Sequence, residues 1–122
     1  MYEPKTEKDI RCALDYGLSL IGGRWKSRVL CLLGQCEQMR YGALREQLVN
    51  ISDTVLSSTL REFLASGLIT RIQFNEIPPH TEYRLTPLGE SVQPILLSIC
   101  RWAEMQQNPG TEPICARCRF PR

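Results

Sequence analysis

The chain has 122 residues, of which 43% are apolar and 23% charged. That length suits one domain with its own hydrophobic core, and the composition excludes a disordered chain. The formal net charge of +2 arises from 15 Lys and Arg against 13 Asp and Glu, which does not by itself indicate a nucleic-acid partner. Such a partner has to be argued from where the charges lie.

The sequence predicts a cytoplasmic protein without membrane contact. No apolar run approaches the roughly 20 residues that span a bilayer, and the N-terminal stretch "MYEPKTEKDIR" lacks the apolar core of a signal peptide. In a reducing compartment the six cysteines are expected to be thiols rather than structural disulfides. We expect Cys31 and Cys36 to be small core residues, because they follow an apolar helical pattern.

The expected domain organisation is an N-terminal arm over residues 1–10, one domain over residues 11–107 and an irregular, proline-rich tail over residues 108–122. Helical spacing of apolar residues predicts a first helix that ends at the pair Gly22-Gly23. A second helix carries the run "WKSRVLCLL", and a short third helix is expected in "RYGALREQLV".

The stretch "ISDTVLSSTLREFLASGL" predicts a fourth helix with strongly specified ends. Ser52 is placed to be its N-cap, and Ile51 and Leu56 occupy the two positions of a hydrophobic staple. Gly67 provides the left-handed position after the helix, and Leu68 the apolar contact of a Schellman motif. The boundaries of this helix are therefore predicted from local chemistry alone.

Two runs with alternating character, "LITRIQF" and "HTEYRLT", follow this helix and are separated by "NEIPP". They predict a two-stranded antiparallel ribbon with a long loop. A last helix then begins at Thr86 and Pro87 and continues to about Gln107, with Pro94 inside it. The expected fold class is α+β and mostly helical.

The third and fourth helices, joined by a short turn, form a predicted helix-turn-helix, and the ribbon directly after them is a predicted wing. A helix of this kind fits the major groove of DNA, where base edges display a donor and acceptor pattern. Short hydroxyl side chains allow close approach, and an arginine can grip guanine with two hydrogen bonds. The predicted DNA-facing residues of the fourth helix are Thr54, Ser57, Ser58 and Arg61.

Further basic and polar residues are candidates for contacts with phosphates or the minor groove. For each of them the alternative is a solvated surface charge without a role in binding. The candidates on the wing are Arg71, His80 and Arg84. Those near the starts of the second and third helices are Lys26, Arg28, Arg40 and Tyr41.

Several linked motifs resemble the HxlR family of bacterial winged-helix transcription regulators, relatives of the MarR type. They lie in the runs "CALDYGLSLIGGRWKSRVLCLL", "ISDTVLSSTLREFLASGLITR" and "PPHTEYRLTPLGESVQPILLSICRW", which cover most of the chain from about residue 12 to 103. The resemblance implies a winged helix-turn-helix that binds a palindromic double-stranded DNA operator as a homodimer, paired through its N-terminal and C-terminal helices. The last helix supports pairing independently, because it is too apolar for a lone surface helix. The expected dimer residues are Leu14, Leu18, Ile95, Ile99 and Trp102.

In this family a cysteine near the start of the first helix often senses oxidants or electrophiles, and Cys12 is at the matching position. Arg11 and the positive end of the helix would favour the reactive thiolate. The chain departs from the family in having Ala13 where a proline is common. A disulfide switch also needs a second thiol, for which Cys100 and the tail pair Cys115 and Cys118 are the candidates.

No cofactor is expected. The tail motif "CARC" supplies two of the four ligands of a structural zinc site, so a zinc site shared between subunits, a redox pair and an inert tail all remain open. Catalysis is disfavoured, because His80 is the only histidine and no phosphate-binding loop is present. The rival to DNA binding is a winged helix used only for protein contacts.

Overall fold

The computed structural model describes residues 12–106, so the predicted arm, the tail, Arg11 and Gln107 lie outside the described residues. The described chain forms five helices and three strands. In chain order these elements are α1 (Ala13–Ile21), α2 (Arg24–Gln35), β1 (Met39–Arg40), α3 (Tyr41–Gln47), α4 (Asp53–Ser66), β2 (Ile69–Phe74), β3 (His80–Leu85) and α5 (Pro87–Met105).

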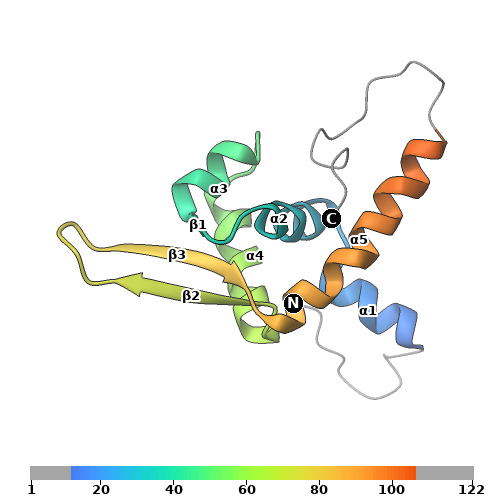
Figure 1. Ribbon diagram of the computed structural model, residues 1–122, viewed down its shortest axis with the longest axis horizontal. Coiled ribbons are helices and arrows are strands. Elements are labelled where there is room, and N and C mark those ends of the chain that lie inside the picture. Colours follow the sequence, from blue (N-terminus) through green and yellow to red (C-terminus); the bar gives the residue numbers. More distant parts are fainter. Residues whose placement is uncertain (1–11, 107–122) are drawn as a thin grey trace.

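The elements form a winged helix-turn-helix, which confirms the predicted fold class. The ribbon of β2 and β3 projects to one side of the domain, α2 lies centrally, and α1 and α5 lie on the side away from the ribbon (Figure 1). A short strand was not predicted: β1 joins the sheet in the order β1-β3-β2, with Met39 opposite Tyr83. Among residues 12–106 no helix is long and apolar enough to cross a membrane.

The ends of α4 confirm the local prediction. The Ser52 Oγ accepts a hydrogen bond from the Val55 N–H at 3.1 Å, so Ser52 is the N-cap. At the other end Gly67 has a φ of 80°, where a side chain would be strained. The Leu68 N–H donates to the Phe63 carbonyl at 3.0 Å, which closes the Schellman motif. Both ends of α4 are thus fixed by residues adjacent in sequence.

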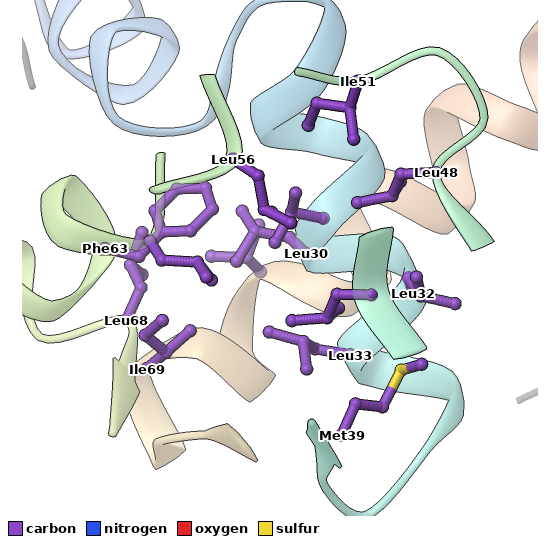
Figure 2. Close-up of a cluster of buried hydrophobic side chains, with 14 of the residues drawn as sticks. Leu30, Leu32, Leu33, Met39, Leu48, Ile51, Leu56, Phe63, Leu68 and Ile69 are labelled. Carbon is purple, nitrogen blue, oxygen red and sulfur yellow. The ribbon is translucent and has the colours of Figure 1, made fainter. Parts of the chain in front are cut away.

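One hydrophobic core holds α4 against α2. Leu30 and Leu33 of α2 meet Leu56 and Phe63 of α4, and Figure 2 shows these side chains pointing toward one another. Phe63 is 1% exposed, so the core side of α4 is fully covered and its opposite side is left for other contacts.

Cys31 and Cys36 differ in their surroundings. Cys31 is half-buried and packs against the core. The prediction that Cys36 is a core residue is wrong: it is exposed and caps the C-terminus of α2. The last buried position of that helix is Leu33, and the chain turns away after Gln35.

Candidate DNA-binding surface

The polar face of α4 presents the hydroxyl groups and the arginine that the sequence predicted. Thr54 and Arg61 are exposed, and Ser57 is half-buried. Within residues 12–106 no hydrogen bond or ion pair engages Arg61, so its guanidinium is available to a ligand. Ser58 differs, because its Oγ donates to the Val55 carbonyl at 3.1 Å within the same helix.

A hollow of about 320 Å³ connects this face to the wing, and we refer to it as the α4–wing hollow. It lies where α3, α4, β2 and β3 meet, so the helix-turn-helix and the wing share one concave surface. Its lining residues are Tyr41, Ser57, Leu60, Arg61, Leu64, Arg71 and Tyr83. The structure therefore brings Arg61 of α4 and Arg71 of β2 to the same surface.

The third arginine of this group, Arg84, lies elsewhere. Arg71 is opposite Tyr83 in the sheet and Arg84 is opposite Thr70, so Arg71 and Arg84 point to opposite faces of the ribbon. Arg84 lines a separate hollow of about 590 Å³, together with residues of α2 and α5 and with Cys36, which directly follows α2. The sequence placed both arginines on the wing but could not assign them to faces.

Tyr41 takes part in a hydrogen-bonded cluster that sequence reasoning missed. Its hydroxyl donates to Asp53 Oδ1 at 2.8 Å and lies 3.3 Å from Ser57 Oγ. Arg45 Nε lies 3.3 Å from the same carboxylate oxygen, Asp53 Oδ1. This cluster ties α3 to the first turn of α4. The sequence signal was Asp53 in the positive first turn, but its partners on α3 depend on how the two helices pack.

Lys26, a candidate phosphate contact, is engaged inside the domain. Its Nζ lies 2.9 Å from Glu62 Oε2, and it donates to the Ser19 carbonyl at 3.0 Å. Burial raises the pKa of the Glu62 carboxyl, but the positive charge around it, including the Lys26 ammonium, outweighs burial and holds the pKa below its ordinary value. Arg28 is exposed, with its guanidinium 5.3 Å from the centre of the Trp25 ring.

His80 and Arg40 lie beside carboxylates. The His80 ring stacks on Phe74 with 4.5 Å between centroids. Its two nitrogens lie 2.8 Å from Glu82 Oε2 and 3.4 Å from Glu76 Oε2. Arg40 Nε also approaches Glu82 Oε2, at 3.9 Å. These acidic partners make the outer part of the wing less positive than the sequence suggested.

A second surface, on α1 and α5, is apolar. Helix α1 has no fully buried residue, although more than half of its side chains are apolar, and within residues 12–106 it contacts the core only through Ile21 at its C-terminal end, so most of its apolar side is uncovered. On α5, Trp102 is 65% exposed. The exposed apolar residues of this surface include all five predicted dimer positions: Leu14, Leu18, Ile95, Ile99 and Trp102.

The two described candidate redox cysteines both belong to these helices. Cys12 is exposed and forms the N-cap of α1, and Cys100 is half-buried on α5. Cys115 and Cys118 lie outside the described residues. No group of His, Cys, Asp and Glu between residues 12 and 106 has the arrangement of a metal site.

Residues 20–111 match the model of the HxlR-like helix-turn-helix proteins. The chain belongs to this family. An uncharacterized HTH-type transcriptional regulator of Methanothermobacter thermautotrophicus is 41% identical over 103 residues, covering 81% of this chain and 78% of the relative.

Solved structures agree with the HxlR-like assignment. A protein described as a MarR-family transcriptional regulator from Porphyromonas gingivalis W83 superimposes with a TM-score of 0.74 and 29% identity, over 87% of this chain and 100% of that one. The redox regulator HypR in its oxidized form gives a TM-score of 0.74 and 30% identity, over 80% and 99% of the two chains. The protein is therefore a transcriptional regulator of the helix-turn-helix type, and its named relatives are regulators rather than enzymes.

Proposed function

We propose that this HxlR-like protein is a homodimer that binds a pseudo-palindromic operator in double-stranded DNA. Helix α4 enters the major groove, and Arg61 contacts a base edge there. The observation that carries the proposal is the exposed guanidinium of Arg61, which has no hydrogen-bond or ion-pair partner among the described residues, on a sharply capped helix and in the same hollow as Arg71 of the wing.

The composition of the α4 face suits close approach to bases. Thr54 and Ser57 are short, so they add hydroxyl groups without holding the helix away from the groove floor. Arg71 supplies a positive charge at the edge of the same hollow, where a phosphate would lie if Arg61 reached a base. We leave Lys26 out of the proposed contacts, because its ammonium is held between Glu62 and Ser19.

The apolar surface of α1 and α5 supports the proposed pairing of two chains. Exposed residues as large as Leu14 and Trp102, at 67% and 65%, are typical of a surface covered by a partner. A second copy related by a twofold axis would place two α4 helices about one helical turn of DNA apart, and a pseudo-palindromic site would match that symmetry.

A salt titration tests DNA binding. Duplex fragments from upstream of the gene are expected to bind tightly at low salt, and affinity should fall roughly a thousandfold between about 50 and about 200 mM salt if about six phosphates are contacted. Electrophoretic mobility shifts at several salt concentrations measure this slope. The rival function, a winged helix for protein contacts alone, predicts that no upstream fragment binds even at low salt.

We further propose that oxidants or electrophiles control binding through Cys12. Two observations support this: the thiol of Cys12 is exposed at the N-terminal end of α1, beside the proposed dimer surface, and a structural neighbour is named as a redox regulator. Oxidation would join Cys12 to a second thiol, with Cys100 or a tail cysteine as partner. The two thiols lose two hydrogens to the oxidant as the disulfide forms.

Operator binding by the wild-type protein is expected to fall at least about tenfold after treatment with diamide, whereas Cys12→Ser retains its affinity. Cys36→Ser is the matched control, because Cys36 is also exposed but lies at the end of α2. Binding curves before and after diamide, with mass spectrometry of the disulfide, measure the effect. If Cys12→Ser loses affinity as the wild type does, Cys12 is not the sensor.

A further inference from the structure

We infer that Tyr41 fixes the hydroxyl of Ser57 as a hydrogen-bond acceptor toward DNA, and so determines which bases α4 accepts beside Arg61. The inference rests on the proposed DNA binding and deepens it, because it assigns a specificity-determining role to a residue of α3 and a base class to Ser57.

The Tyr41 hydroxyl donates its single proton in one hydrogen bond. The oxygen atoms nearest to it are Asp53 Oδ1 at 2.8 Å, Ser57 Oγ at 3.3 Å and the Asp53 carbonyl at 3.4 Å. The carboxylate and the carbonyl of Asp53 are acceptors only. Arg45, with Nε 3.3 Å from Asp53 Oδ1, supplies the balancing positive charge. Tyr41 therefore donates to Asp53.

The contact between Tyr41 and Ser57 then has a defined direction. A hydroxyl has a single proton, so the Tyr41 oxygen, having donated to Asp53, faces Ser57 as an acceptor. The hydrogen bond at 3.3 Å between the two hydroxyls consequently uses the proton of Ser57. What Ser57 presents to any further partner is a lone pair.

That lone pair faces the proposed DNA surface. Ser57 and Arg61 both line the α4–wing hollow and are four residues apart, so they lie on the same side of the helix one turn from each other. Arg61 has only donors, and Ser57 offers only an acceptor. The face therefore displays a fixed pattern of one acceptor beside a set of donors.

Bases complement this pattern in a specific way. In the major groove adenine and cytosine present amino donors, at N6 and N4, whereas guanine and thymine present oxygen acceptors at the corresponding places. Arg61 suits guanine, and the acceptor of Ser57 suits adenine or cytosine at a neighbouring position. Without Tyr41 the Ser57 hydroxyl would rotate freely, so it could either donate a hydrogen bond to a base or accept one from it.

The test is selection of operator half-sites from a randomised library by the full-length protein, followed by affinity measurements with each base at each position. Ser57→Ala identifies the position that Ser57 contacts, since its base preference disappears there. Every base pair carries one amino group, on adenine or cytosine, so a base analogue that lacks this amino group at that position is expected to lower wild-type affinity by about three- to tenfold, the range of one hydrogen bond.

Tyr41→Phe keeps the ring and removes the hydroxyl, and it is expected to reduce that loss of affinity to less than about twofold while the guanine preference of Arg61 stays. Asp53→Asn, whose amide can donate to Tyr41, should relax the same position. Ser66→Ala is the control, because it removes a hydroxyl from the last turn of α4, where the Ser66 Oγ donates to the Phe63 carbonyl and does not line the α4–wing hollow. It should leave every preference unchanged.

The possible outcomes distinguish failure of the proposed role of Tyr41 from failure of the proposed DNA binding. Wild-type affinity that is unchanged when the base amino group at the Ser57 position is removed, or a Tyr41→Phe profile identical to the wild type, overturns the role of Tyr41 while DNA binding stands. If the wild type selects no sequence at all, the proposed DNA binding itself is refuted. Thermal unfolding of Tyr41→Phe and Asp53→Asn checks that both variants are folded.

Discussion

Ile99→Asp is expected to leave the protein monomeric at micromolar concentration and to weaken operator binding by about a hundredfold or more. Ile99 is 51% exposed, and it lies between Ile95 and Trp102 on the apolar side of α5. A carboxylate at that place would have to be desolvated in a covered interface, which is strongly unfavourable. A monomer then contacts one half-site and loses the gain from binding both.

Sedimentation velocity and operator titrations measure the two effects in the same preparation. Leu88→Asp is the matched control, since Leu88 has a similar exposure of 53% but lies in the first turn of α5, where a negative charge is favourable. It should remain dimeric. An Ile99→Asp protein that still sediments as a dimer and binds the operator fully would show that α5 does not pair the chains.

The parts of the fold that local chemistry decides could be predicted from the sequence. The N-cap at Ser52 and the close at Gly67 and Leu68 involve residues within one turn of the helix end, so their spacing is visible in the chain. Strand β1 could not be predicted in the same way. It has two residues, and it exists only because Met39 lies opposite Tyr83, far along the sequence.

The candidate site also has features that local sequence predicts and features that depend on contacts distant in sequence. The spacing of the α4 residues placed Thr54, Ser57 and Arg61 on the face away from the core, because helical periodicity alone decides that. Partners distant in sequence could not be foreseen. Lys26 meets Glu62 only after α2 packs on α4, so the ion pair made by this candidate phosphate contact could not be read from the sequence.

The face of the wing on which each arginine lies depends on one quantity that the sequence does not give, the register of the strands. Successive strand residues alternate between faces, so the position of Arg84 depends on the register of β3 against β2. Alternation within "HTEYRLT" separates Tyr83 from Arg84, but it does not say which of them joins α4. Packing of Tyr83 against the core decides this.

Arg61→Ala is expected to reduce affinity for the selected operator by about 5- to 150-fold, which corresponds to about 1 to 3 kcal/mol, and to change affinity for random DNA far less. The reason is that a base contact contributes only on the correct sequence, whereas a phosphate contact contributes on every duplex. Arg71→Ala is therefore expected to weaken both kinds of DNA alike. Arg84→Ala, which removes an arginine from the opposite face of the ribbon, should have little effect on either.

The ratio of operator affinity to random-DNA affinity, measured by fluorescence anisotropy at one salt concentration for the wild type and these three variants, tests the central claim most directly. The account predicts that the ratio collapses for Arg61→Ala and stays at the wild-type value for Arg71→Ala and Arg84→Ala. Equal losses on operator and random DNA for Arg61→Ala would contradict the claim that α4 recognises bases through Arg61.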